Sequence, residues 1–519
     1  MRKRLFTFYA VLFGSINFLS AQITFQKTIG GTAGDYGMYA HQTTDGGYII
    51  TGFTESFGAG EEDVFLIKTD MNGNTMWSKT FGDTTQELGY SVQQTSDGGY
   101  IIVGITQPIL SAINAEVYLI KTDVNGDTLW TRKFGALNAD VGESVQQTTD
   151  GGYIIAGITG YGAGSSDVYL IKLDASGNST WAKTYGGNDA DFGYFVRQTS
   201  DGGYIITGTT ESFGAGDIDV YLIKTDSIGN AVWSKAFGGS NDDLGRSVYQ
   251  TTDGGYIIAG TTHSFGTGVA DAYVIKTDSS GDTLWTKTYG GTYWDQGASA
   301  CQTSDGGYLI TGQLFNCAYL IKTNSTGDTL WTKAFIGGNS AFGKSVWQTA
   351  DGGYFITGLH YHPGTSYILC LKTDSSGIGG CTQANQATIV TYPATQVTSP
   401  LTTVFSAPVL NTACTVFVGS GGTDSTLCST VGINELTKAD LFLISPNPSL
   451  GNFNLLFDNR ILNGKVEILN ILGAKVFAEN IFNESKKEIT LKNISSGIYF
   501  VKVFDEEKYY CKKIIIERD

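Results

Sequence analysis

The stretch Ser96-Asp-Gly-Gly-Tyr-Ile-Ile-Val-Gly104 decides the fold, because its central tetrapeptide recurs along most of the chain. Asp-Gly-Gly-Tyr is found seven times, at spacings of 46 to 53 residues. A repeat of this period is typical of solenoids and propellers. The seven copies begin at Asp45, Asp97, Asp150, Asp201, Asp253, Asp305 and Asp351.

Each repeat contains four segments with the character of short strands. In the second repeat they are residues 90–95, 100–104, 117–121 and 128–133. Asp-Gly and Asn-Gly turns join the first pair and the last pair, and such turns accept the positive φ angles of tight hairpins. The pattern predicts a four-stranded antiparallel meander. Seven such sheets bury their faces by packing around an axis, so we predict an all-β, seven-bladed β-propeller.

The last repeat lacks its fourth strand, and the start of the chain supplies one. The fourth-strand tryptophan is present in six repeats, but none follows residues 372–377. Residues 25–31 parallel residues 285–291, with Phe25 in place of Trp285. We therefore expect the N-terminal strand to complete the last blade and to close a ring over residues 22–380.

The repeat Asp-Val-Tyr-Leu-Ile-Lys-Thr-Asp-x-x-Gly-Asn/Asp-x-x-Trp resembles the bacterial seven-bladed propeller repeats of extracellular proteins. The resemblance covers about residues 23–380. It implies the propeller fold and leaves the function open, because propellers host binding, scaffolding and catalysis alike.

The two faces of the predicted ring differ in how much they vary. The first-to-second and third-to-fourth turns share one face and are nearly the same in every repeat. The second-to-third loops and the blade connections share the other face, and loops such as residues 55–60, 107–111 and 360–364 have little in common. Variable loops on a rigid scaffold often carry function, so we expect a specific site on the variable face.

The blade connections on this face carry a repeated acidic residue two positions before a glycine. A ring of these carboxylates at the channel mouth would bind a ligand, or a cation such as calcium, which prefers oxygen ligands. The alternative is that each carboxylate accepts hydrogen bonds from local backbone amides. A second acidic series begins the third strands and has the same two interpretations. The first series is Asp35, Glu87, Asp140, Asp191, Asp243 and Asp295, with Ala341 in the seventh repeat, and the second is Asp63, Glu116, Asp167, Asp219 and Asp271.

A single active site in a sevenfold ring needs residues that depart from the repeat. His360 and His362 lie in one loop, but no carboxylate or cysteine lies beside them. The motifs of serine hydrolases, zinc proteases and phosphate loops are missing from the sequence. We therefore predict a non-catalytic protein with no catalytic residues, no metal ligands and no cofactor. The alternative is a propeller enzyme that acts on extracellular polysaccharide, either a glycosidase or a lyase; a glycosidase would need two carboxylates that break the repeat.

The first 21 residues have the character of a signal peptide. Arg2, Lys3 and Arg4 precede an apolar stretch, and Ser20-Ala21 offers a cleavage site. The mature chain would begin near Gln22 and contains no further segment able to span a membrane. The full sequence has a formal charge of −16, which argues against nucleic-acid binding. Seven cysteines allow disulfides in an oxidising compartment, but an odd count leaves at least one thiol unpaired.

Two further regions follow the repeats. Residues 381–437 are rich in Thr, Ser, Ala and Val, which favours an extended, partly disordered linker. The alternative is a set of extra strands on the propeller. Residues 438–519 alternate strand-like runs with Gly and Asn turns, and they predict a small immunoglobulin-like β-sandwich.

The motifs of this last region are specific. Pro446-Asn-Pro448, Gly451-Asn-Phe453, the run Gly497-Ile-Tyr-Phe-Val-Lys-Val503 and the lysines 512 and 513 resemble the C-terminal sorting domain of the type IX secretion system of Bacteroidetes. The resemblance implies the type IX secretion machinery as a partner, removal of the tail, and a secreted or outer-surface location. In that setting we predict a binding or adhesion module whose ligand is a glycan or a protein.

Overall fold

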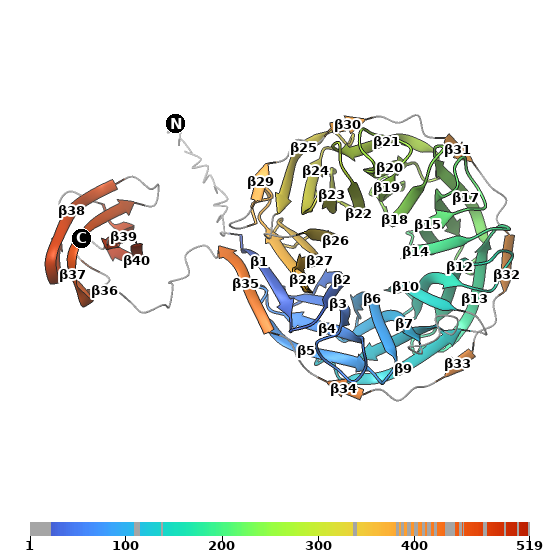
Figure 1. Cartoon of the computed structure of the whole chain (residues 1–519), viewed down its shortest axis with the longest axis horizontal. Helices are drawn as coiled ribbons and strands as arrows, with labels where there is room; N and C mark the ends of the chain where they lie inside the picture. Colours follow the sequence, from blue (N-terminus) through green and yellow to red (C-terminus); the bar gives the residue numbers. More distant parts are fainter. Residues whose placement is uncertain are drawn as a thin grey trace, which may run out of the picture. The chain divides into compact units, whose positions relative to one another are not determined.

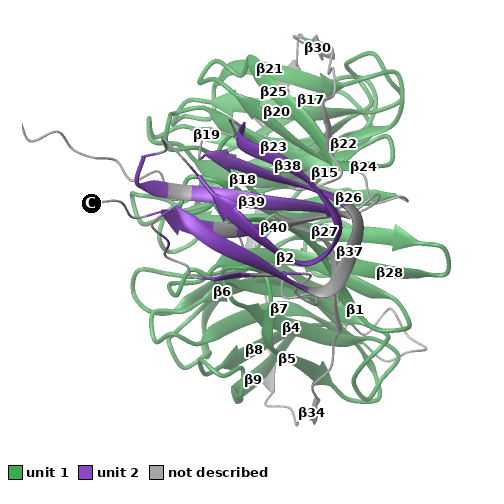
Figure 2. Ribbon diagram, turned by 90° about the vertical axis from the view of Figure 1, so that its left-hand side faces the viewer, with its two compact units in different colours: residues 1–432 green, residues 433–519 purple. Residues whose placement is uncertain are grey.

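The computed structural model describes residues 22–107, 115–135, 139–335 and 340–379, the strand segments between 383 and 430, and residues 442–445, 449, 451–470, 475–491, 495–505 and 508–516. The chain forms two compact units, residues 1–432 and 433–519 (Figure 2). The predicted signal peptide lies outside the described residues. Within the described part of the chain, no helix is long and apolar enough to cross a membrane.

The first unit is a ring of seven antiparallel sheets around a central axis (Figure 1), which confirms the predicted seven-bladed propeller. Within each blade, consecutive strands pair as a meander, and the first strand is innermost. The first three blades are β2 (Asp35–Gln42), β3 (Tyr48–Thr54), β4 (Asp63–Thr69) and β5 (Thr75–Gly82); β6 (Gln86–Gln94), β7 (Tyr100–Gln107), β8 (Glu116–Thr122) and β9 (Thr128–Gly135); and β10 (Asp140–Gln147), β11 (Tyr153–Thr159), β12 (Asp167–Leu173) and β13 (Ser179–Gly186). The next three are β14 (Asp191–Gln198), β15 (Tyr204–Thr210), β16 (Asp219–Thr225) and β17 (Ala231–Gly238); β18 (Asp243–Gln250), β19 (Tyr256–Thr262), β20 (Asp271–Thr277) and β21 (Thr283–Gly290); and β22 (Asp295–Gln302), β23 (Tyr308–Leu314), β24 (Cys317–Thr323) and β25 (Thr329–Phe335).

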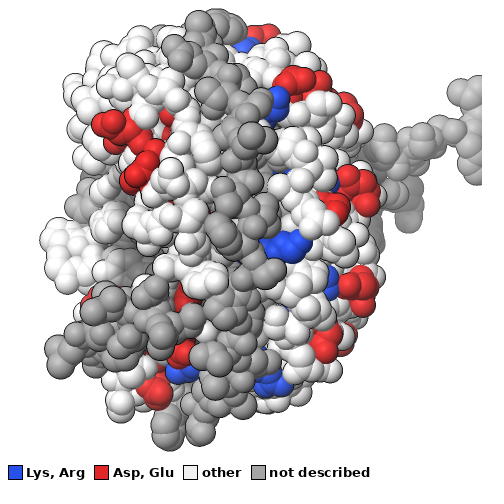
Figure 3. All heavy atoms as spheres, turned by 90° about the vertical axis from the view of Figure 1, so that its right-hand side faces the viewer, with Lys and Arg blue, Asp and Glu red and all other residues white. Residues whose placement is uncertain are grey.

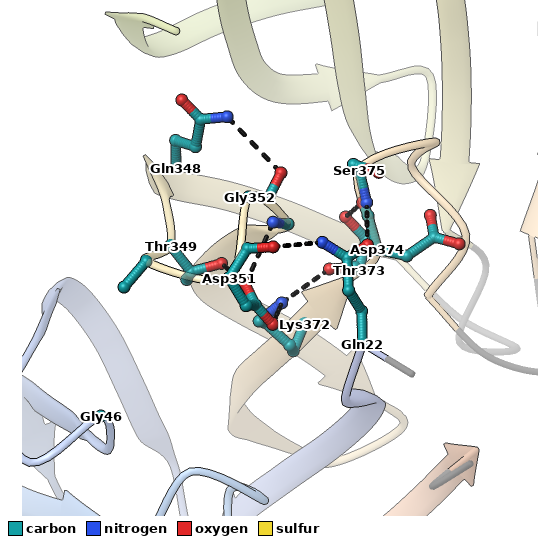
Figure 4. Close-up of polar contacts among 12 residues, drawn as sticks. Gln22, Gly46, Gln348, Thr349, Asp351, Gly352, Lys372, Thr373, Asp374 and Ser375 are labelled. Atoms are coloured by element: carbon teal, nitrogen blue, oxygen red, sulfur yellow. Dashed lines mark hydrogen bonds and ion pairs between the residues drawn. The ribbon is translucent and has the colours of Figure 1, made fainter. Parts of the chain in front are cut away.

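The seventh blade joins the two ends of the repeat region. Strands β26 (Ala341–Gln348), β27 (Tyr354–His362) and β28 (Thr365–Thr373) supply three strands, and β1 (Thr24–Gly30) supplies the fourth. Phe25 lies opposite Lys372 in the antiparallel register. The side chain of Gln22 also accepts a hydrogen bond from the backbone of Ser375 and donates one to the backbone of Asp351 (Figure 4). The predicted closure by the N-terminal strand is therefore confirmed.

The repeated tetrapeptide acts through three separate contacts. Its aspartate pairs with a buried lysine of the third strand in every blade, as in Asp97 and Lys121, whose Oδ2 and Nζ are 2.9 Å apart. Its first glycine has a positive φ, +86° at Gly98, where glycine is strongly preferred. Its second glycine leaves room for the neighbouring strand, since a Cβ at Gly99 would lie 2.1 Å from the carbonyl oxygen of Thr122.

The tyrosine of the tetrapeptide packs against the preceding blade. The ring centres of Trp77 and Tyr100 are 5.8 Å apart, and a Cβ at Gly126 would lie 2.8 Å from the Trp77 indole. Phe25 takes the tryptophan's place in the seventh blade and packs on Tyr48 of the first. Aromatic contacts of this kind repeat around the ring and hold blade to blade.

A fifth strand covers the outer edge of every blade. In the described parts of residues 383–430, each short strand pairs antiparallel with one outermost strand, and their chain order runs backwards around the ring, as Figure 1 shows. This segment, which we call the belt, is therefore not a free linker but the set of extra strands that was the alternative. Outer edges of sheets expose unpaired backbone groups, and the belt hydrogen bonds to them. Its strands are β29 (Gln383–Asn385) on β25, β30 (Ile389–Thr391) on β21, β31 (Gln396–Thr398) on β17, β32 (Thr403–Ser406) on β13, β33 (Leu410–Thr412) on β9, β34 (Phe417–Gly419) on β5 and β35 (Thr423–Thr430) on β1.

The second unit is a small all-β domain. Its strands pair in the order β36-β37-β39-β40, with β38 on the other side of β37. Alternate side chains such as Val466, Ile468, Val501 and Val503 form one buried core, which explains the strand-like alternation of the sequence. The strands are β36 (Phe442–Ser445), β37 (Asn452–Asn470), β38 (Lys475–Thr490), β39 (Gly497–Asp505) and β40 (Lys508–Ile516).

Candidate functional site in the central channel

The first repeated acidic series lies at the starts of the innermost strands. Its six side chains are at most 2% exposed, from Asp35 at 0% to Glu87 at 2%. In the first blade, the N–H of Gly31 and the hydroxyl of Ser56 each donate to Asp35 Oδ2 at 2.7 Å. The corresponding backbone amides donate to Asp191, Asp243 and Asp295 at 2.6 to 2.8 Å.

The second acidic series holds the second-to-third loops. Oδ2 of Asp63 accepts from the N–H groups of Ala59 and Gly60, both at 3.0 Å. Asp219 and Asp271 accept equivalent pairs. Burial raises the pKa of these carboxyls, and it raises the pKa of Asp167 to about 6.

These contacts favour the interpretation in which each carboxylate serves its own blade. Within the described residues, no group of three or more His, Cys, Asp or Glu side chains is placed to hold a metal ion. The binding of a ligand or of calcium by Asp35, Glu87, Asp140, Asp191, Asp243 and Asp295 stays a prediction. The histidines of the seventh blade point to no shared site either, since His360 is buried and His362 is exposed at the end of β27.

Acidic side chains on the outer surface are also spread out. On the face drawn in Figure 3, red side chains recur along the edges with blue ones beside several of them. Charged side chains also pair between neighbouring blades of the ring, as in Lys235 and Asp282 at 3.0 Å. The negative charge of the repeats therefore does not gather into one patch on this face.

The channel wall is where the seven blades differ. A β-bulge interrupts every first strand after its glycine, as between Gly37 and Tyr39, and the bulged residue lines the channel. Bulges re-aim side chains and are frequent beside functional sites. We call these seven residues the bulge ring. They are Met38, Tyr90, Glu143, Tyr194, Arg246, Ala298 and Lys344.

The bulge ring encloses a cavity of about 230 Å³. At about 30 Å³ per water molecule, this volume equals roughly eight waters, which is room for one sugar ring. The guanidinium carbon of Arg246 lies 4.8 Å from the centre of the Tyr194 ring, and Nζ of Lys344 lies 4.2 Å from that of Phe342. Aromatic faces and fixed cations therefore line one small space.

One carboxylate shares this cavity. Burial raises the pKa of Glu143 to about 7, although Arg246 and Lys344 lower it, and burial lowers the pKa of Lys344 to about 8. None of the ion pairs in the described part of the chain joins these three residues. Titratable groups that have shifted pKa values and form no ion pair with one another are typical of binding and active sites.

A second group of aromatic side chains lies on the variable face. Tyr293, Trp294 and Phe315 are 60%, 46% and 56% exposed. The rings of Tyr293 and Phe315 are 4.8 Å apart, and the His263 ring lies 5.2 Å from Trp294. Phe315 has a φ of +56°, which is strained for an aromatic residue. Exposed aromatic rings held in this way suit stacking against a sugar.

Sequence reasoning missed the bulge ring. The available signal was the position directly after the glycine of each first strand, which carries a different residue in almost every repeat, although the residue before it is always glycine and the residue after it is Ser in five repeats. The sequence analysis chose the repeated acidic residues instead, although a residue present in every repeat is expected to stabilise the structure that all blades share.

Comparisons with known proteins identify the second unit. Residues 443–517 match the family described as the secretion system C-terminal sorting domain. The regulatory protein FlaEY of Caulobacter vibrioides is 23% identical over 265 residues, which is 48% of this chain and 25% of that protein, so the chain spans about a quarter of that relative's length. A solved gluconolactonase-like protein is 9% identical with a TM-score of 0.33, over 55% of this chain and 89% of that one. A Bacteroides thetaiotaomicron protein of unknown function is 11% identical with a TM-score of 0.32, over 67% and 95%.

The family match agrees with the motifs that the tail carries, from Phe453 to the lysines near its end. A sorting domain of this family directs its protein through the type IX secretion system. The chain is therefore a seven-bladed β-propeller protein with a type IX C-terminal sorting domain, and its location is secreted or on the outer cell surface.

Proposed function

We propose that the propeller is a non-catalytic binding module that holds a glycan, with an acidic sugar seated in the cavity of the bulge ring. The observation that carries the proposal is that this ring breaks the sevenfold repeat and gathers aromatic and charged side chains around one cavity. Small-molecule sites combine such a concave apolar wall with a few polar groups that fix orientation.

Four members of the ring have a matching part in an acidic sugar. The Tyr194 ring offers an apolar face to the C–H side of a pyranose. Arg246 and Lys344 would donate to the sugar carboxylate, and Glu143 would accept from hydroxyl groups. The exposed Tyr293, Trp294 and Phe315 would stack on further sugars of a longer chain.

The enzyme alternative has weaker support. A glycosidase uses two carboxyl groups about 5 to 10 Å apart, and Glu143 is the single carboxylate among the residues that line this cavity. A lyase would use a tyrosine beside cations, and Tyr194 beside Arg246 offers such an arrangement. Release of product therefore has to be measured directly.

The test is retention of the purified mature chain on a panel of neutral and acidic polysaccharides, with assays for reducing ends and for unsaturated sugars. We expect retention on acidic glycans without product. Arg246→Gln should lower the affinity at least tenfold, whereas Lys79→Gln, which removes the same charge from the outer rim, should not. Release of sugars would overturn the non-catalytic proposal, and equal binding by both variants would overturn the cavity as the site.

A further inference from the structure

A second set of side chains that break the repeat lines the other end of the channel. Three positions after each bulge, the innermost strand places one more side chain toward the channel, near the invariant turns. We call these residues the turn-side ring. They are His41, Gln93, Gln146, Arg197, Tyr249, Cys301 and Trp347. Most of them, together with Tyr39, line a cavity of about 200 Å³.

Arg197 is the cation of this cavity. Its Nη2 donates to the hydroxyls of Tyr39 at 2.6 Å and Tyr249 at 3.4 Å, and its Nη1 donates to the carbonyl oxygen of Val196 at 3.0 Å. The guanidinium carbon also lies 4.2 Å from the ring centre of Phe195. Among the described residues, no ion pair gives Arg197 a carboxylate.

Two glutamines and a tryptophan of the cavity offer donors as well. Oε1 of Gln93 accepts from the N–H of Gln147 at 2.6 Å, and Oε1 of Gln146 accepts from the N–H of Gln198 at 2.7 Å. Since the amide oxygens are used in this way, the NH₂ groups of both glutamines are the ends left to contact the cavity. The indole N–H of Trp347 has no hydrogen-bond acceptor.

A cavity lined by unused donors and one cation without a carboxylate is suited to an anion. A guanidinium has five N–H donors, and the three bonds above leave two of them. A single cation is matched in charge by a single carboxylate, which can accept from the remaining Nη1 or Nε donor, whereas a phosphate dianion would call for a second cation. His41 adds no charge here at neutral pH, because burial and Arg197 lower its pKa.

We propose that the turn-side cavity binds a small molecule through its carboxylate, which pairs with Arg197 and accepts from Trp347 and from the two glutamine amides. The site shares Tyr39 with the cavity of the bulge ring, but Arg197 is its own cation, and it does not depend on the glycan proposal. Its occupant is a monocarboxylate small enough for about 200 Å³.

The experiment is calorimetric titration of the purified mature chain with sodium acetate, with sodium glucuronate and with inorganic phosphate. We expect saturable binding of a carboxylate and weaker binding of phosphate. Arg197→Gln should reduce carboxylate affinity at least tenfold. Arg132→Gln, which removes a guanidinium from the outer face of Trp130, is the matched control and should leave the affinity unchanged.

A milder variant guards against misfolding. Trp347→Phe keeps an aromatic ring and removes only the indole N–H, so it should reduce carboxylate affinity severalfold with an unchanged thermal unfolding curve. The proposal is overturned if neither carboxylate binds up to the solubility of its salt, if phosphate binds more tightly than both, or if Trp347→Phe and Arg132→Gln bind alike.

Discussion

The backbone N–H of Ala350 donates to Oε1 of Gln42, 308 residues earlier in the chain, at 2.9 Å. The equivalent bond joins each of the remaining pairs of adjacent blades, for example from Thr44 to Gln94 and from Ser304 to Gln348. Each glutamine also donates from Nε2 to its own turn, as Gln348 does to Gly352 (Figure 4). Seven glutamines therefore link the turns into a closed circuit, and Gln42 closes it.

Removing one glutamine of this circuit should destabilise the propeller. Gln42→Ala deletes two hydrogen bonds, and we expect a loss of about 2 kcal/mol in the free energy of unfolding, since each such bond contributes about 1 kcal/mol net. Chemical denaturation followed by tryptophan fluorescence measures it. Gln198→Ala makes the same deletion inside the chain and should cost a similar amount if the ring unfolds as one unit. A Gln42→Ala protein as stable as the wild type would contradict the role of the circuit.

The two glycines of the tetrapeptide should differ in their response to alanine. Gly98→Ala meets no atom within 4 Å and suffers only from its φ of +86°, a cost of about 1 kcal/mol. Gly99→Ala places a methyl group 2.1 Å from the Thr122 carbonyl oxygen, so strands β7 and β8 must separate. We expect a loss of about 3 kcal/mol or more there. Urea midpoints of the two variants decide the order, and a larger loss at Gly98 would refute this account.

The buried acids predict that stability decreases between mildly acidic and neutral pH. Asp167 has a pKa of about 6 in the folded chain against 3.8 for the exposed group, because burial disfavours its charge. The folded state therefore holds a proton that the unfolded state has released. This contribution is full below pH 3.8 and disappears as pH rises through about 6, with a total of up to about 3 kcal/mol.

Asp167→Asn is the direct test of this titration. The amide keeps an acceptor for the N–H of Gly164 and carries no charge. We expect the variant to gain stability relative to the wild type at pH 7.5 and to lose most of that advantage at pH 4. Denaturation at both pH values gives the difference. A difference in stability that does not change with pH would show that Asp167 ionises normally.

The aspartates of the turns predict the opposite behaviour at strongly acidic pH. Asp201 has its pKa lowered to about 2, because hydrogen bonds from Thr199, Lys224 and Gly203 outweigh its partial burial. Its contribution is full above pH 3.8 and is lost as pH falls through about 2. Asp201→Asn should therefore flatten the acid limb of the stability curve below pH 4. The control is Asp127→Asn, an exposed partner of Lys79 on the rim.

The blades were predictable because the residues of each repeat determine its local structure. Hairpin turns and a Lys–Asp pair form within each repeat, and a Trp–Tyr contact joins each repeat to the next, so seven copies at spacings of 46 to 53 residues were enough. The closure by Phe25 followed from the same pattern. The sorting domain was predictable because its motifs are specific.

The belt and the channel were not predictable in the same way. Belt strands such as β30 and β33 are three residues long and pair through backbone groups, so no side-chain pattern marks them. The bulge ring depends on an extra residue in each first strand, and a two-residue alternation does not reveal which side chain a bulge turns inward. For Asp35 and Asp243 the repeat pattern predicted the position at the start of the first strand. It did not predict how deeply these side chains are buried.

The belt gives the molecule a mechanical property. It leads from the seventh blade backwards around the rim and ends at β35, which pairs with β1 and precedes the sorting domain in the chain. While the sorting domain remains attached, a pull on it would load β35 first and then peel off the belt strands of three or four residues one after another. The belt would then behave as a series of sacrificial bonds, absorbing work at low force and re-forming when the tension falls. Stretching single molecules between Gln22 and the C-terminal unit should give several small extensions ahead of the large ones.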